Sequence, residues 1–251
     1  MKRITWLTFG SLLVACTSSS NPPTREQYDD TAQAIASTTA SSGGGGDVAS
    51  MSDTVSISLG AMPAGFSLTG NGHFHGSRLG VDYDYAITCK NATGATNLCG
   101  PATDQASVDV SWSGTLDTAN VDADVSRTGH WAVTGLQSDT ATFNGDSTFS
   151  FDATLTSIFR PGVTATYSFD ASASYDDIRI ATQQRQVIGG TATFDLSAHH
   201  QVTGAGANNV DASFDVHAQI TFHADRTADL VLDGSQHYSL NLSSGAVART
   251  N

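Results

Sequence analysis

Apolar and polar residues alternate with a period of two along most of the chain after residue 53. The alternation is clearest over residues 108–113, 149–155 and 214–223, where Val, Phe, Trp, Ile, Leu and Ala take turns with Asp, Ser, Thr, Gln and His. Successive side chains on a β-strand point to opposite faces, so each run has one apolar and one polar face. Antiparallel sheets with one solvated face show this pattern. We therefore predict a single all-β domain over residues 53–251.

Turn-forming residues divide these runs into about ten long strands. The signals include Asn144-Gly145-Asp146, Arg160-Pro161-Gly162, Gly189-Gly190 and Asp233-Gly234, and such residues supply the positive φ angles that tight hairpins need. We expect an antiparallel up-and-down meander that curls into a barrel or a curved half-barrel, because curling covers the apolar face and protects strand edges. A β-sandwich is the alternative.

A Phe-Asp pair recurs in four of the predicted strands. Phe151, Phe169, Phe194 and Phe214 are each followed by Asp, at intervals of 18, 25 and 20 residues. A fixed interval would indicate a solenoid or a propeller. The uneven spacing instead fits successive meander strands, each placing a Phe in the core and an Asp in solvent.

The start of the chain has the features of an export signal. Lys2 and Arg3 precede a short apolar stretch, which is too short to span a bilayer. Leu13-Val14-Ala15-Cys16 resembles the lipobox of bacterial lipoproteins. That resemblance implies that residues 1–15 are removed as a signal peptide and that Cys16 carries acyl chains, including palmitate-type chains, which anchor the protein to a membrane. It also implies the outer membrane, because Thr17 and not Asp follows the cysteine.

Residues 16–52 are predicted to be a lipidated cysteine followed by a flexible tether. This stretch is rich in Ser, Thr, Ala and Gly and includes four consecutive glycines at 43–46. Such a composition offers too little apolar surface to offset the chain entropy lost on folding. Residues 28–37 could form a short helix, but they lack a broad apolar face.

The charge of the chain excludes one class of partner. The net charge is −13, and it becomes about −15 when Lys2 and Arg3 leave with the signal. Lys90 is then the one remaining lysine in the sequence. Nucleic-acid binding depends on Lys and Arg that neutralise phosphates, so we expect no nucleic-acid partner. The acidity favours solubility.

The cysteines other than Cys16 are Cys89 and Cys99. Exported proteins meet an oxidising compartment, so we expect a disulfide between them. A bridge across this short polar loop would stabilise the fold by about 2–3 kcal/mol.

Histidines are the main candidates for chemistry. By strand parity His73 and His75 share the polar face about 7 Å apart, which makes them a candidate metal-ligand pair without an identifiable third ligand. The alternative is a solvated sheet face. His200, in contrast, falls on the apolar face, where a hydrogen-bonded core histidine is expected. Carboxylate pairs at Asp82-x-Asp84 and Asp122-x-Asp124 match no calcium loop.

No catalytic motif or cofactor-binding motif is present, so we expect no cofactor and assign no catalytic residue. Two functions remain about equally supported: a lipoprotein that binds an apolar ligand such as a lipid, suggested by small residues on the apolar face, and a non-enzymatic structural or adhesion module of the cell envelope. An outer-membrane β-barrel is a further alternative, although a lipid anchor would be redundant on it.

We predict that Cys16→Ser abolishes membrane attachment while the β domain stays folded. The lipid is the one anchor expected from the sequence, and the predicted tether should share few contacts with the core. Fractionation of the cell envelope after a salt wash, together with thermal unfolding of the released protein, checks both halves. A variant that still pellets with membranes would overturn the lipoprotein interpretation.

Overall fold

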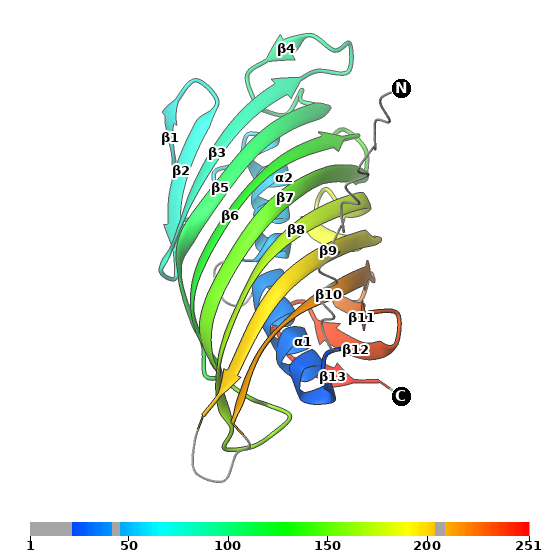
Figure 1. The fold of residues 1–251 in the computed structure, drawn as a ribbon. Helices are drawn as coiled ribbons and strands as arrows, with labels where there is room; N and C mark the ends of the chain where they lie inside the picture. The colour runs from blue at the N-terminus through cyan, green and yellow to red at the C-terminus, as the bar shows by residue number, and fades with distance from the viewer. Residues whose placement is uncertain (1–21, 42–45, 204–208, 251) are drawn as a thin grey trace, which may run out of the picture.

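The computed structural model describes residues 22–41, 46–203 and 209–250. Within them the chain forms two helices followed by one antiparallel sheet of thirteen strands (Figure 1). The helices are α1 (Arg25–Thr39) and α2 (Asp47–Ser58). The strands are β1 (Phe66–Gly70), β2 (His73–Arg78), β3 (Val81–Lys90), β4 (Thr96–Asn97), β5 (Gln105–Asp117), β6 (Val121–Thr134), β7 (Thr140–Thr156), β8 (Thr164–Ala181), β9 (Gln186–Val202), β10 (Val210–Phe222), β11 (Thr227–Leu232), β12 (Gln236–Asn241) and β13 (Val247–Arg249).

The predicted up-and-down meander is confirmed. Apart from β4, which pairs only with β3, the strands are hydrogen-bonded to their neighbours in sequence order from β1 to β13. The period-two pattern is visible as burial: β6 alternates buried and exposed residues over its whole length. The sheet curves but is not closed, because β1 and β13 do not pair. The half-barrel is therefore the correct form, and the closed-barrel and two-sheet sandwich alternatives are wrong.

Two of the predicted turns lie inside strands. Gly145 falls within β7, and the pairing register with β8 shifts between Phe143 and Gly145. A Cβ on Gly145 would lie 2.4 Å from the carbonyl oxygen of His130, so glycine allows close strand approach there. Gly190 lies within β9 at φ 102°. Both glycines mark irregularities in long strands, which is a recognised alternative use of a strand glycine.

The predicted tether is wrong for the part of it that the structure describes. Residues 25–39 and 47–58 are helical, and most of their side chains are buried against the apolar face of the sheet. The folded unit therefore begins by α1, and the predicted domain start at Asp53 falls in the middle of α2. Strands β5 to β9 cross one side of the helices and β12 and β13 lie beside α1 (Figure 1).

Local sequence explains how α1 begins. Thr24 and Gln27 form a capping box: the Thr24 hydroxyl accepts from the Gln27 amide, and the Gln27 side chain accepts from the Thr24 amide. The helix interior is polar, but small residues such as Ala32 and Ala34 are fully buried. A helix of small residues can approach a sheet closely without a broad apolar stripe.

Aspartates of α1 bind arginines of the sheet. The Asp29 carboxylate accepts two hydrogen bonds from the Arg249 guanidinium of β13 and one from the Tyr238 hydroxyl at 3.1 Å. Asp30 pairs with Arg160 in the β7–β8 turn. Both carboxylates are completely buried, so they need these partners to offset the loss of hydration.

Helix α2 is held in the same way. Asp47 pairs with Arg127 of β6 and accepts a hydrogen bond from Tyr175 at 3.0 Å. Burial lowers the pKa of Arg127, whose guanidinium also lies 5.1 Å from the centre of the Phe149 ring.

The second contact of α2 is a two-pronged pair between Asp53 and Arg78 of β2, with both N–O distances at 3.1 Å. Burial raises the pKa of Asp53, although Arg78 opposes the shift.

The predicted disulfide is confirmed. Cys89 and Cys99 are bonded, and the bridge ties the end of β3 to the loop that follows β4. Residues 1–15, Cys16 and Thr17 lie outside the described residues. In the described part of the chain, no helix is both long enough and apolar enough to cross a membrane.

We predict that Asp30→Ala destabilises the protein by about 3–5 kcal/mol, because it leaves Arg160 without its buried partner. Urea unfolding at neutral pH measures the change. The control is Asp152→Ala, which removes an exposed carboxylate of β7 and should cost less than about 0.5 kcal/mol. If both variants unfold alike, α1 is not docked on the sheet.

We also predict that the fold weakens above pH 10. Burial and a hydrogen bond to Asp233 raise the pKa of Tyr28 to about 12, and burial raises the pKa of Tyr83, Tyr85, Tyr167 and Tyr238. A tyrosine whose pKa is higher in the folded state than in the unfolded state favours folding while it stays protonated. Its contribution to the free energy of unfolding is complete below the unfolded pKa of about 10 and is lost as the pH rises through the folded pKa. Tyrosinate absorbance should therefore rise together with loss of β-sheet circular dichroism; separate transitions would contradict this coupling.

Candidate functional site

The polar face of the sheet, defined as the face turned away from α1 and α2, carries two continuous rows of polar side chains, which are hydroxyls and carboxylates except for one histidine. The rows follow from the pairing register, which places one residue of each strand opposite the next. One row is Asp82, Ser113, Ser126, Ser150, Asp170, Ser197 and Asp215; the other is Asp84, Ser111, Thr128, Thr148, Ser172, Asp195 and His217. Neighbouring strands lie about 4.8 Å apart, so the rows form a regular grid.

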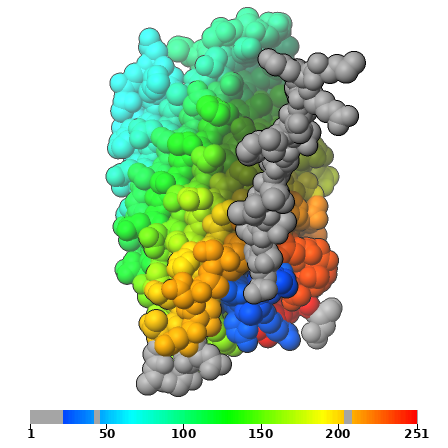
Figure 2. Space-filling view, viewed as in Figure 1, coloured from blue at the N-terminus to red at the C-terminus, as the bar shows by residue number. Residues whose placement is uncertain are grey.

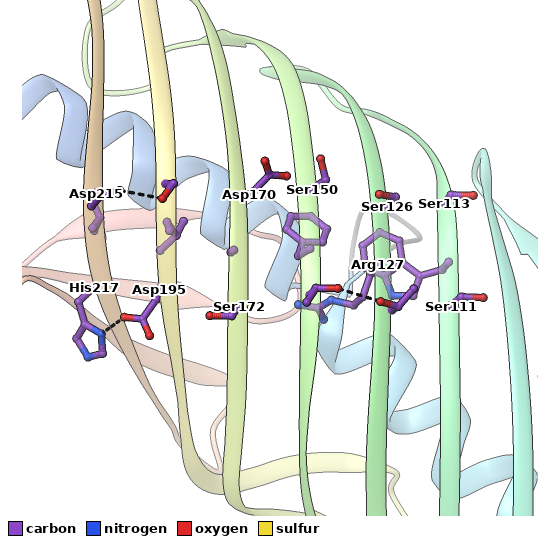
Figure 3. A pocket seen from close by; sticks show the side chains of 18 of the residues that line it. Ser111, Ser113, Ser126, Arg127, Ser150, Asp170, Ser172, Asp195, Asp215 and His217 are labelled. Atoms are coloured by element: carbon purple, nitrogen blue, oxygen red, sulfur yellow. Dashed lines mark hydrogen bonds and ion pairs between the residues drawn. The ribbon is translucent and has the colours of Figure 1, made fainter.

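These rows line a hollow of about 1170 Å³, which we call the polar hollow (Figure 3). It stretches across β3 and β5 to β10 and ends at Asp233 in the β11–β12 turn. Six aspartates line it. The one arginine among its lining residues, Arg127, is buried and is paired with Asp47. The polar hollow is therefore strongly negative and lined by hydrogen-bonding groups.

Hydrogen bonds between neighbouring strands fix several of these side chains. The Ser197 hydroxyl donates to Asp215 at 2.8 Å, and the hydroxyls of Thr128 and Thr148 are 2.9 Å apart. The backbone N–H of His217 donates to Asp233 at 2.8 Å. Most of the serines make no such contact in the described structure, so their hydroxyls face solvent. In the space-filling view these strands form one broad surface, and α1, in blue, lies beside β10, in orange (Figure 2).

Histidine and aspartate pair repeatedly across the strands of the polar face. The ring nitrogen Nδ1 lies close to a carboxylate oxygen in His75–Asp84 (3.0 Å), His130–Asp109 (2.5 Å) and His217–Asp195 (2.8 Å). In each pair the two residues are direct neighbours in the register. The predicted placement of these histidines on the polar face is thus confirmed. The sequence pattern did not predict their aspartate partners.

The candidate metal pair does not gain a third ligand from the described residues. His73 and His75 do share the exposed face of β2, as predicted. However, His75 is hydrogen-bonded to Asp84, and the described residues contain no group of three or more His, Cys, Asp or Glu side chains suited to a metal ion. The pairs Asp82/Asp84 and Asp122/Asp124 are also exposed on their strands. Metal binding at His73 and His75 stays a prediction.

His200 is the buried, hydrogen-bonded histidine that the sequence predicts. Its Nε2 lies 2.9 Å from the Asp30 carboxylate, beside the Asp30–Arg160 pair. The ring also packs edge-on against Tyr167. His200 therefore belongs to the contact between α1 and the sheet and does not line the polar hollow.

One group on the polar face has the three residue types of a catalytic triad, with the two ring nitrogens of the histidine exchanged. His199 lies between the Ser213 hydroxyl, 3.2 Å from Nδ1, and the Asp211 carboxylate, 3.5 Å from Nε2. In serine hydrolases the aspartate is buried and fixes the histidine, whereas 67% of the Asp211 side chain and 45% of the His199 side chain are exposed. We assign these three residues no catalytic role.

The polar hollow is a site that the sequence does not predict. The polar half of each alternating strand, considered by itself, indicates only a solvated face. The signal that was present is compositional: the polar positions of β5 to β9 are almost all Ser, Thr and Asp, without Lys. The register needed to align them is a property of the folded sheet.

No family model, curated protein or solved structure matches this chain.

Proposed function

We propose that this protein is a lipid-anchored, non-enzymatic binding module of the cell envelope that holds a basic protein segment in its polar hollow. The observation that carries the proposal is the charge of the hollow: six aspartates line it, and its single arginine is buried and paired. A partner rich in Lys or Arg would relieve the repulsion among these carboxylates.

The form of the polar hollow also suits an extended polypeptide. Serine and threonine hydroxyls fill the middle of both rows and carboxylates lie toward the row ends, so donors and acceptors are available to a peptide backbone as well as to cationic side chains. The hollow crosses seven paired strands, which provide a rigid platform. A rigid surface loses little conformational entropy on binding.

The disposition of the other face supports a module in preference to a carrier. Helices α1 and α2 occupy the apolar face, and alanines such as Ala153, Ala171 and Ala218 are buried there. An apolar ligand in that place would require the helices to leave and the buried Asp–Arg pairs to break. Binding of an apolar ligand such as a lipid therefore stays a prediction from the sequence.

The membrane anchor in this proposal rests on the lipobox-like residues 13–16. The location that follows from it is the cell envelope, most simply the outer membrane.

The test uses the full chain carrying Cys16→Ser and a fluorescent oligolysine peptide. We predict that a triple variant weakens binding of this peptide by at least about tenfold at low salt; it combines Asp82→Asn, Asp170→Asn and Asp215→Asn. Fluorescence anisotropy gives the affinity. The matched control is Asp117→Asn, Asp139→Asn and Asp176→Asn, which removes equal charge from exposed positions that do not line the hollow.

The control triple should weaken binding by no more than about twofold, through net charge alone. Equal losses in the two triple variants would show attraction to the whole acidic surface and would contradict a localised site, as would the absence of any oligolysine binding.

A further inference from the structure

A second hollow, of about 270 Å³, lies beside α2 and has the opposite charge to the rest of the surface. Its walls include Val48, Ala49 and Ser52 of α2, Leu242 and Ser243 after β12, and the turns of two hairpins. Three arginines border it: Arg78, Arg185 and Arg226. We call it the arginine hollow. It shares no lining residue with the polar hollow.

This concentration of arginine is unusual for the chain, because three of the nine Lys and Arg side chains in the described residues border this one hollow. Four arginines of the described residues, Arg78 among them, bind the buried aspartates of the two helices. Arg185 and Arg226 differ: in the described structure neither has a carboxylate within ion-pair distance. Two guanidinium groups without a carboxylate partner in the described structure thus border one small hollow in an Asp-rich protein.

The topology brings these two arginines together. Arg185 lies in the β8–β9 turn and Arg226 in the β10–β11 turn. In a meander, alternate hairpins turn at the same end of the sheet, so the two tips are neighbours. Gln186 links them: its amide donates to the Ala224 carbonyl at 2.7 Å, and its oxygen accepts from Arg226 Nε at 3.1 Å.

The backbone at both arginines is in the left-handed region. Arg185 has φ 55° and Arg226 has φ 65°, a conformation that glycine or asparagine would adopt more easily. Each turn therefore carries a long cationic side chain where a smaller residue would fit the backbone better. The third arginine, Arg78, is held in place by Asp53.

The charges select the class of ligand. Arg78 and Asp53 offset each other, and Arg185 and Arg226 leave two positive charges. A phosphate monoester carries nearly two negative charges at neutral pH, and arginine binds it with paired N–H donors. We propose that the arginine hollow binds a small molecule or headgroup that carries a phosphate group.

The test uses the full chain carrying Cys16→Ser, so that the lipid cannot cause membrane binding. Calorimetric titration with inorganic phosphate and with glycerol phosphate measures free anions. Flotation with phosphatidylcholine vesicles, with and without phosphatidic acid, measures a lipid headgroup. The binding variant is Arg185→Gln with Arg226→Gln. The matched control is Arg25→Gln with Arg179→Gln, two exposed arginines that do not line the hollow.

We expect binding that the Arg185/Arg226 variant weakens by at least about tenfold and the control leaves nearly unchanged, with equal thermal unfolding for both. If the free anions bind in this way, the ligand of the arginine hollow is a soluble phosphate compound. If the protein floats only with vesicles that contain phosphatidic acid and does not bind the free anions, the ligand is a lipid headgroup. Absence of binding in both assays, or equal losses in the two double variants, overturns the proposal. Oligolysine binding in the polar hollow is measured separately, so failure of either site does not decide the other.

Discussion

The constraint on which this structure depends is the need to cover the apolar face of a wide, open sheet. A meander that does not close leaves one face that water would contact, and burial of that face is the main source of stability. In this protein two helices poor in large apolar residues cover the apolar face. They contribute small side chains that pack closely and four buried carboxylates, each bound to an arginine of the sheet or its turns. Removing charges from water is costly, and the pairs offset this cost only when both partners are present. The ion pairs therefore do not simply add stability: they fix where each helix lies, because a helix shifted along the sheet would leave several charges buried without partners.

The same arrangement explains how the chain distributes its few basic residues. Arg127, Arg160 and Arg249 bind the helices, and none of them is available to neutralise the aspartates on the other face. The polar face keeps its carboxylates, and some of them are hydrogen-bonded to histidine, as at His75–Asp84 and His217–Asp195. The helices that cover the apolar face thus take up arginines, and the polar face stays negative because those arginines are not available to it. The arginine hollow is the exception, and it lies where hairpin turns meet α2 and not on the polar face.

The sequence alone was enough to predict the sheet, its antiparallel meander, the disulfide and the facing of most histidines, because each depends on local alternation or on the chemistry of one residue type. His200 was placed correctly from parity alone. The helices were not predicted, because the usual signal for a docked helix is an apolar stripe, and α1 is buried through Asp29, Asp30 and alanines instead. The capping box at Thr24 and Gln27 was a readable sign of a helix start, but it does not report burial. The sequence predicts turns at Gly145 and Gly190, because a strand glycine and a turn glycine cannot be distinguished until the strand pairing is known. The polar hollow was out of reach for a related reason: it consists of alignment across strands, which the sequence of any one strand does not contain.

Docking of α1 changes what a lipid on Cys16 would do. A tether of 37 residues would let the domain range far from the membrane, whereas eight residues separate Cys16 from Arg25 at the start of α1. Fully extended, they span no more than about 29 Å. The lipid would then hold the sheet close to the bilayer, and any force on a partner in the polar hollow would pass through the sheet to α1. The pairs of Asp29 and Asp30 with Arg249 and Arg160 would hold α1 on the sheet under that force, and they are shielded from solvent on the aspartate side and so are weakened little by salt. If Cys16 carries lipid and the polar hollow holds a partner, the buried ion pairs of α1 lie between the anchor and the binding face.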